Sequence, residues 1–244
     1  MTTAGRRFAP PDPPAFEGGS GSLAESVRQA AVEALARLDL AAVSAAAQDL
    51  APRVRAGGLL QTFGSGHSQL LALEGFYRAG GPAWLRPLVD DRLSPIRGFS
   101  VTSYERSEGL GGELAARLGP HDSLLVVSTS GRNAVPVELA EAAGAAGLLT
   151  IAITTRRPGN RLAAAVAHVL NAGVPVGDAS VEVGGARMGP LSTVVGGVLL
   201  HGLLAETEAA LGAGSVLVSN NVDGGDVHNR ALIERYPHLL GLTS

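Results

Sequence analysis

The sequence predicts an α/β fold in which helices cover both faces of a parallel β-sheet. Short apolar segments alternate with longer segments whose apolar residues recur at helical spacing. In addition, two turns rich in glycine and hydroxyl residues, Gly64–Ser68 and Ser128–Gly131, each follow an apolar segment and precede a helical one. Parallel strands collect their carboxyl ends at one edge of the sheet, so both turns are expected at that edge.

The composition limits the kind of protein that this chain can be. Its 244 residues suffice for one large domain, and with 45% hydrophobic but only 4% aromatic residues the core must be built from Ala, Val and Leu. The net charge of −3 gives no reason to expect nucleic acid or an anionic membrane as a partner. We also expect no apolar stretch of the roughly 20 residues that span a bilayer. With no secretory signal expected and no cysteine present, the sequence predicts a cytoplasmic protein.

The chain contains no lysine, because all 19 of its basic residues are arginine. This excludes Schiff-base chemistry, attachment of pyridoxal phosphate and a Walker-type phosphate lysine. A bound phosphate would have to be held by hydroxyls, backbone N–H groups or arginine. Proton transfer would fall to Glu, Asp or His.

The elements follow in order along the chain. Residues 1–21, with four prolines and a Gly-Gly-Ser-Gly run, are expected to form a flexible tail, which leaves 22–244 as a single domain. Helices are predicted from Leu23, capped by Ser22, and over residues 40–56, 67–79, 108–118, 135–146 and 190–211. Strands are predicted over residues 59–63, 83–89, 123–127, 148–154 and 166–170. Residues 90–107 are expected to form a long loop, 156–166 to contain a short helix, 173–189 to form a hairpin or ordered loop, and 220–240 to end in a helix.

The first turn has the residues that an anion site needs. Gly64 and Gly66 permit close approach of the backbone, and the hydroxyls of Ser65 and Ser68 can donate to a phosphate or sugar oxygen. The turn is not a dinucleotide fingerprint, because Gln69 stands where the third glycine would be. His67 lies within the turn and could open a sugar ring, ligate a metal or cap the helix.

The second turn adds further hydroxyls. Ser128, Thr129 and Ser130 are successive, and Asn133 follows closely. Three hydroxyls in a row exceed what a helix cap requires. The two turns together therefore predict a phosphate site.

These motifs resemble those of the SIS (sugar isomerase) domain family. The resemblance rests on Gly64–Ser68, Ser128–Asn133 and Gly189–Thr193, and it extends from about residue 22 to residue 240. More narrowly, Gly64–Gly81 and Asn221–Asn229 resemble an uncharacterised bacterial subfamily of phosphosugar isomerase-like SIS proteins. The resemblance implies a five-stranded, flavodoxin-like three-layer sandwich and a homodimer or homotetramer with its active site at the subunit interface. It also implies a sugar phosphate bound near Ser68, Ser128, Ser130 and Asn133.

One catalytic position departs from the family pattern. In heptose isomerases and in etherases acting on muramic acid phosphate, a catalytic acid lies ten residues after the serine that matches Ser68, and here that position is Arg78. Glu74, about one turn earlier on the predicted helix, is the candidate base. Arg78 would either pair with Glu74 or contact the anionic end of the ligand. His201 and Glu74 could supply two of the ligands of a metal site that resembles that of the heptose isomerases.

The segment from Asp223 to Asn229 is a further candidate. Asp223, Asp226 and His228 lie within it, just before a predicted helix, where they serve either as turn and cap residues or as ligand contacts. Because a partner's histidine often completes the site in SIS isomerases, the resemblance implies that His228 acts across a dimer.

The leading hypothesis is a sugar-phosphate isomerase that moves a proton through an enediol. Glu74 would be the base and His228 the acid or proton relay, with no cofactor or metal required. The substrate contacts would be Ser65, His67, Ser68, Arg78, Ser128, Thr129, Ser130, Asn133, Asp223 and Asp226. A phosphosugar lyase or etherase and a non-catalytic sugar-phosphate sensor are the alternatives.

Overall fold

The computed structural model describes residues 22–241 and contains the predicted parallel sheet. Its five strands are β1 (Leu60–Gly64), β2 (Leu85–Pro87), β3 (Ser123–Val127), β4 (Leu149–Thr154) and β5 (His168–Asn171). They are all parallel and lie in the order β2-β1-β3-β4-β5. This is the doubly wound, flavodoxin-like order, so the fold class predicted from the sequence is confirmed. The tail expected at residues 1–21 lies outside the described residues.

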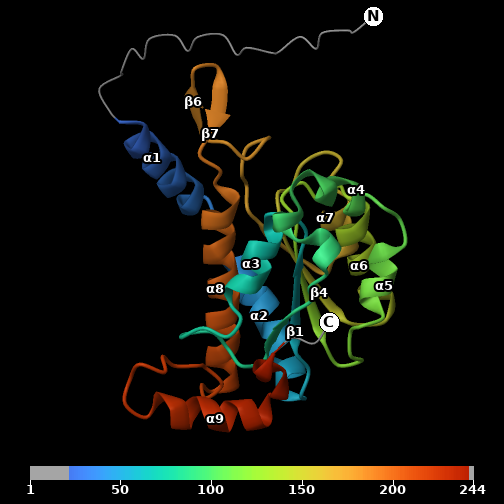
Figure 1. Ribbon diagram of the computed structural model, residues 1–244, viewed down its shortest axis with the longest axis vertical. Helices are drawn as coiled ribbons and strands as arrows, with labels where there is room; N and C mark the ends of the chain where they lie inside the picture. The colour runs from blue at the N-terminus through green and yellow to red at the C-terminus, as the bar shows by residue number, and fades with distance from the viewer. Residues whose placement is uncertain (1–21, 242–244) are drawn as a thin grey trace, which may run out of the picture.

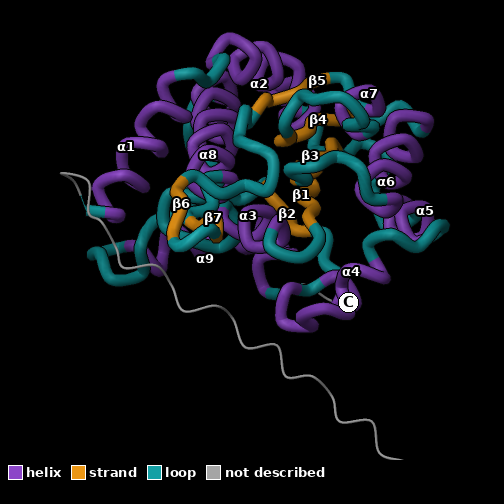
Figure 2. The backbone as a smooth tube through the Cα atoms, turned by 90° about the horizontal axis from the view of Figure 1, so that it is seen from above, coloured by secondary structure: helices purple, strands orange, loops and turns teal. Residues whose placement is uncertain are grey.

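Helices cover both faces of the sheet (Figures 1 and 2). One face carries α1 (Leu23–Ala36), α2 (Leu40–Arg55), α3 (Ser68–Glu74) and α8 (Ser192–Leu211), and the other carries α5 (Leu110–Ala115), α6 (Ala134–Ala145) and α7 (Leu162–Ala165). The remaining elements are α4 (Val101–Tyr104), α9 (Gly225–Arg235), three short 3-10 segments (Asp91–Leu93, Pro95–Ser100 and Pro237–Leu240) and an antiparallel hairpin of β6 (Val181–Val183) and β7 (Ala186–Met188).

The alternation of side chains along β3 divides the core into two halves. Leu125 and Val127 pack into the cluster beneath α2 and α8, whereas Leu124 and Val126 pack against α5 and α6. Every residue of β3 is buried, as expected for a strand covered on both faces. The core is mostly aliphatic, which agrees with the low aromatic content.

Helix α8 corrects one expectation. It has 20 residues and a mean hydropathy of 1.4, so by length and composition it is able to cross a membrane, contrary to our prediction that no such stretch exists. Core helices of globular proteins meet the same test. Of an apolar 18-residue segment of α8, 44% is buried, and the helix packs closely against α2. Its apolar character is therefore accounted for, in part, by its place in the core.

Two segments differ from their predicted form. The helix expected over residues 67–79 spans only Ser68–Glu74, with Gly75 as its C-cap. Three residues after Glu74, Tyr77 has a left-handed backbone (φ 44°), which ends any helical path. The expected loop 90–107 contains two 3-10 segments and α4 rather than irregular chain alone.

A buried glutamate joins the end of α8 to the sheet. Glu208 is 6% exposed, and one of its carboxylate oxygens accepts a hydrogen bond from Trp84 Nε1 at 2.7 Å. The other oxygen accepts from the backbone N–H groups of Gly214 (3.0 Å) and Ser215 (2.8 Å). These three donors would have no partner without the carboxylate.

Replacing this glutamate should therefore destabilise the fold. We expect Glu208→Ala to lower the free energy of unfolding by about 2–3 kcal/mol, measured by urea denaturation, because buried donors lose their acceptor. The control is Glu206→Ala on the same helix, where the exposed carboxylate contacts only Ser44 Oγ and the change should stay within about 0.5 kcal/mol. Equal losses in the two variants would contradict this assignment.

Candidate functional site

A cavity of about 140 Å³ lies at the carboxyl edge of the sheet. The ends of β3 and β4, the segment after β5, and the first residues of α3 and α8 form its walls. Its lining consists of His67, Ser68, Leu71, Val127, Thr129, Ile153, Ala172, Asp178, Ser192 and Thr193. Both turns singled out in the sequence therefore contribute to one cavity, as the parallel topology requires.

The first turn brings Ser68 to the cavity through close packing of its own backbone. A Cβ atom at Gly64 would lie 2.3 Å from the carbonyl oxygen of Ser68, so only glycine fits there. Gly66 has a left-handed backbone (φ 56°), and its N–H donates to Leu93 O at 2.9 Å. Ser65 points elsewhere: its hydroxyl donates to Glu105 Oε2 at 2.9 Å.

The second turn contributes Thr129 to the cavity. Ser128 is buried, and its hydroxyl oxygen accepts a 3.3 Å hydrogen bond from the N–H of Gly131, so it stabilises the turn. Ser130 is exposed, and Asn133 is half-buried at the start of α6 without making a side-chain cap. Neither Ser130 nor Asn133 is among the residues that line the cavity.

Asp178 is a cavity residue that the sequence analysis missed. Its carboxylate accepts hydrogen bonds from the backbone N–H groups of Leu191 (3.0 Å) and Ser192 (2.8 Å), and also from the Ser192 hydroxyl. Its own backbone is left-handed (φ 54°), a conformation that costs energy for a residue other than glycine. Asp178 thus places a negative charge at the amino end of α8, where the helix dipole stabilises it.

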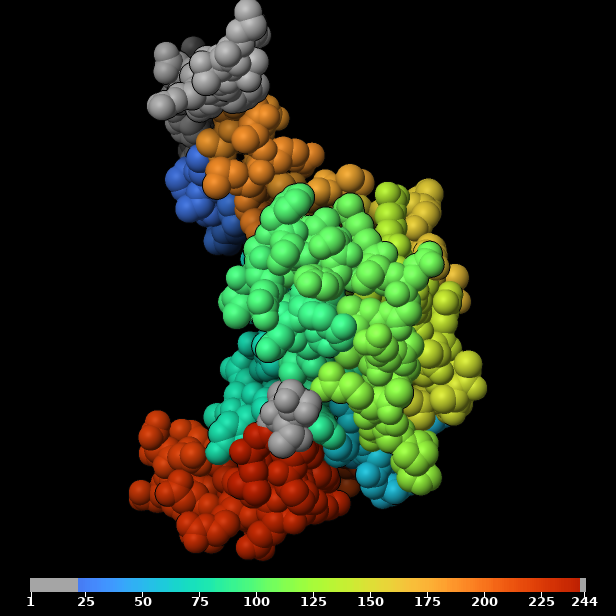
Figure 3. Space-filling model, turned by 45° about the vertical axis from the view of Figure 1, so that its right-hand side comes forward, coloured from blue at the N-terminus to red at the C-terminus, as the bar shows by residue number. Residues whose placement is uncertain are grey.

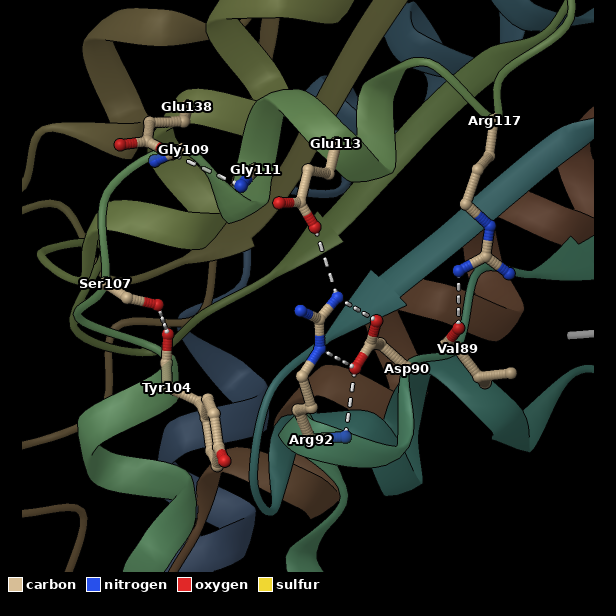
Figure 4. A network of polar contacts seen from close by, with 10 residues as sticks. All are labelled: Val89, Asp90, Arg92, Tyr104, Ser107, Gly109, Gly111, Glu113, Arg117 and Glu138. Atoms are coloured by element: carbon tan, nitrogen blue, oxygen red, sulfur yellow. Dashed lines mark hydrogen bonds and ion pairs between the residues drawn. The ribbon is translucent and has the colours of Figure 1, made fainter.

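A polar network supports the segment that follows β2 (Figure 4). Arg92 donates to Asp90 through both Nε (2.9 Å) and Nη2 (2.8 Å), and Nη2 also lies 3.3 Å from Glu113. The hydrogen bonds from the Arg92 side chain hold the pKa of Asp90 below its usual value. This network fixes the segment that supplies Leu93 to the first turn.

Glu74 and Arg78 form an ion pair outside the cavity lining. Both side chains are nearly half exposed, and His201 Nε2 on α8 lies 3.6 Å from the Glu74 carboxylate. The pairing of Arg78 with Glu74 is one of the two arrangements expected from the sequence. Within residues 22–241, no group of three or more His, Asp or Glu side chains is placed to hold a metal ion.

The C-terminal candidates lie at the other end of the molecule from the cavity. His228 on α9 donates from Nε2 to Val216 O at 2.8 Å, and Asp223 and Asp226 are exposed. Helix α8 begins at the cavity and runs roughly 30 Å, at 1.5 Å per residue, toward this segment. Figures 1 and 3 show α9 and the β6–β7 hairpin at opposite ends of the molecule. One chain alone therefore does not bring His228, Asp223 or Asp226 together with Ser68.

Two carboxylates of this region, Asp178 and Glu105, were not among the residues predicted for the site. Glu105 lies in the segment 90–107, whose length had already marked it as a functional candidate. Asp178 lies in the glycine-rich segment 173–189, interpreted only as a hairpin or loop. No local pattern distinguishes either carboxylate, because each contacts a residue distant in the sequence.

The fold and the cavity define an α/β protein with a cavity lined by hydroxyl side chains, a histidine and a carboxylate at the carboxyl ends of parallel strands. The SIS domain family profile matches residues 25–155. A UPF0309 protein of Listeria monocytogenes is 33% identical over 213 residues, covering 80% of this chain and 86% of the relative. A UPF0309 protein of Brucella canis is 36% identical over 213 residues, covering 80% and 88%. The chain therefore belongs to the SIS domain family.

Solved structures share the fold. The phosphoheptose isomerase of Neisseria gonorrhoeae has a TM-score of 0.51 at 23% identity, covering 76% of this chain and 94% of that one. The sugar isomerase domain of the RpiR transcription factor from Sphaerobacter thermophilus has a TM-score of 0.54 at 18% identity, covering 88% and 99%. A candidate phosphosugar isomerase involved in capsule formation, from Bacteroides fragilis, has a TM-score of 0.55 at 23% identity, covering 79% and 93%.

The second turn offers a direct test of how the cavity is built. Gly131 has a left-handed backbone (φ 60°), and a Cβ there would lie 2.0 Å from Asn160 Oδ1. We expect Gly131→Ala to displace Thr129 and to lower the melting temperature. The control is Gly144→Ala near the end of α6, where nothing lies within 4 Å and the change should stabilise by about 0.5–1 kcal/mol. Differential scanning fluorimetry of both variants decides, and an unchanged Gly131→Ala protein would contradict the prediction.

Proposed function

We propose that this protein binds a sugar phosphate in the cavity and interconverts its aldose and ketose forms. The observation that carries the proposal is the convergence of the Ser68, Thr129 and Thr193 hydroxyls on one small cavity that no arginine lines. Hydroxyls together with backbone N–H groups can hold a phosphate monoester without a cation. The sharing of this fold with a phosphoheptose isomerase and with a candidate phosphosugar isomerase supports the same ligand class.

The chemistry requires a base and an acid beside the sugar. A base removes the proton from C2 of the open-chain aldose while an acid protonates the carbonyl oxygen at C1, which gives an enediol. Loss of the proton from the C2 hydroxyl and delivery of a proton to C1 then give the ketose. Histidine and carboxylate side chains both perform such transfers near neutral pH.

His67 is the group in this chain that is best placed for such proton transfer. It lines the cavity and is exposed, so a ligand can reach its ring. The Asp178 carboxylate, by contrast, is already engaged, because it accepts three hydrogen bonds from the start of α8. We assign ring opening or proton relay to His67.

Glu74 and His228 remain candidates for proton transfer across a subunit interface. On the elements beside Glu74, α3 and α8 carry an exposed apolar stripe that includes Leu70 (49% exposed), Val194 (47%) and Val198 (43%). An apolar stripe of this kind is suited to contact with a second copy of the chain. In such a homodimer or homotetramer, Arg78, Asp223 and Asp226 would come from the neighbouring copy.

A sensor that binds the same ligand without turning it over is the second candidate. The shared fold with the sugar isomerase domain of a transcription factor supports it. Isomerase and sensor are separated by measuring exchange of the sugar C1 and C2 protons with solvent.

Ligand binding should depend on the cavity hydroxyls. We expect the Ser68→Ala/Thr129→Val variant to bind sugar phosphates at least about tenfold more weakly than the native protein, because each hydroxyl gives a charge-assisted hydrogen bond. Isothermal titration with pentose 5-phosphates, hexose 6-phosphates and heptose 7-phosphates measures this. The control variant Ser26→Ala/Ser44→Ala on α1 and α2 should bind normally. Unchanged binding by the cavity variant would remove the cavity from the proposal.

Catalysis should depend on the proposed proton-transfer groups. For a sugar phosphate that binds, His67→Asn should slow proton exchange at C1 and C2 by about 100-fold or more, followed by NMR in D₂O, with binding retained. Glu74→Gln should do the same if Glu74 is the base. Full exchange in a folded Glu74→Gln protein would exclude that role, and full exchange in His67→Asn would exclude His67.

A further inference from the structure

The loop between β4 and α7 carries an unusual concentration of positive charge beside the cavity. Residues 156–161 read Arg-Arg-Pro-Gly-Asn-Arg. Arg132, from the second turn, lies against this loop, since its Nη2 donates to Pro158 O at 3.0 Å and a Cβ at Gly159 would be 3.3 Å from it. Two adjacent loops therefore bring four guanidinium groups to one part of the carboxyl edge.

This arginine loop is fixed to the cavity wall. The N–H of Thr155 donates to the carbonyl of the cavity residue Thr129 at 3.2 Å, and the N–H of Arg161 donates to Gly131 O at 2.9 Å. Asn160 Nδ2 donates to Thr154 Oγ1 at 2.8 Å and to Thr155 O at 2.7 Å. The loop and the second turn thus form one hydrogen-bonded unit.

The charges of this unit have no carboxylate partners in the part of the chain that the structure describes. None of the ion pairs among residues 22–241 involves Arg132, Arg156, Arg157 or Arg161. Among the described residues, the arginines that form ion pairs with carboxylates are Arg28, Arg78 and Arg92. Arg132 and Arg157 donate to backbone carbonyls instead, which leaves their charge uncompensated.

The guanidinium group of Arg157 also lacks a hydrogen-bond partner at one of its nitrogen atoms. Its Nη2 donates to Val174 O at 3.0 Å, two residues beyond the cavity residue Ala172, and its buried Nε has no hydrogen-bond partner. Buried donors are usually satisfied, so the orphaned Nε marks Arg157 as a side chain whose hydrogen bonding is incomplete in the free protein. Arg156 and Arg161 are exposed, so both are accessible to an anion in solution.

We infer that the arginine loop is a second anion subsite and that the ligand carries a second negatively charged group, a phosphate or a carboxylate, besides the phosphate in the cavity. This inference rests on the proposed sugar-phosphate binding. Guanidinium groups bind both kinds of oxyanion through paired N–H donors. The preferred substrates are therefore sugar bisphosphates or phosphorylated sugar acids, rather than sugar monophosphates that carry no second charged group.

The test compares matched ligands by isothermal titration. Fructose 1,6-bisphosphate should bind the native protein at least about tenfold more tightly than fructose 6-phosphate, as one charge-assisted contact provides. In Arg156→Gln/Arg161→Gln the two affinities should become nearly equal. Both side chains are exposed, so this variant is expected to fold normally. The comparison of 6-phosphogluconate with glucose 6-phosphate tests the same preference for a ligand whose second charged group is a carboxylate.

A control variant removes the same amount of charge elsewhere. Arg37→Gln/Arg230→Gln changes exposed residues at the end of α1 and on α9, and it should keep the native preference. Equal affinities of the native protein for both members of both pairs would overturn the inference, as would a preference that survives in Arg156→Gln/Arg161→Gln.

Titration with inorganic pyrophosphate separates this inference from the proposed function. If no sugar phosphate binds the native protein, the proposed function fails on its own. Pyrophosphate binding that is at least about tenfold weaker in Arg156→Gln/Arg161→Gln would then still support an anion subsite at the loop. Absence of pyrophosphate binding, or binding unaffected by these substitutions, would overturn it.

Discussion

The close contact between α8 and α3 is the constraint on which the cavity depends. A Cβ at Gly196 would lie 2.3 Å from Leu71 Cδ2, and one at Gly75 would lie 2.9 Å from Leu204 Cδ1. A larger residue at either position would require these leucine side chains to repack, so the two glycines favour the close approach of the helices. Their approach brings Ser68 and Ser192, at the two helix starts, into the same cavity. The small residues of the core therefore determine the geometry of the site.

The cavity combines neutral donors with one carboxylate that is already engaged. Asp178 takes the backbone N–H groups at the start of α8, so these are not available to another anion while its hydrogen bonds last. Hydroxyls and the His67 ring are left to face an incoming ligand. Positive charge is kept outside, on the adjacent loop of residues 156–161. Hydroxyl, imidazole and carboxylate groups thus line the cavity, whereas the arginines lie on the adjacent loop.

The sequence predicted the features that depend on local spacing. The order of strands and helices, the position of both turns and the arrival of Ser68 and Thr129 at one edge all follow from periodicity and parallel topology. Features that depend on contacts between distant segments were missed. The carboxylate of Asp178 meets α8 only because the hairpin folds back, and Glu105 meets Ser65 only through the segment after β2. The spacing of residues along the chain does not predict these contacts between distant segments.

The difference between local spacing and long-range contacts also explains why some of the predicted site residues lie outside the cavity. Glu74 was matched to a catalytic acid by its distance along a helix, but the helix ends at Glu74 and its carboxylate pairs with Arg78 on the outer face. The segment 223–229 has a composition typical of a ligand-binding site. Composition alone does not indicate its position in the fold, and the segment lies at the end of α8 that is distant from the cavity. The predicted phosphate contacts Ser128 and Ser65 likewise already bond within the chain, to Gly131 and Glu105.

The β6–β7 hairpin is joined mechanically to the wall of the cavity. At the base of the hairpin, the Ser180 hydroxyl donates a 2.7 Å hydrogen bond to Gly189 O. Two residues earlier, the Asp178 carboxylate accepts a hydrogen bond from the backbone N–H of Ser192 at the start of α8. The hairpin is thus connected to the start of α8 twice, through the Asp178 carboxylate and through the chain that runs from Gly189 into the helix, so the hairpin and this wall of the cavity form one continuous unit.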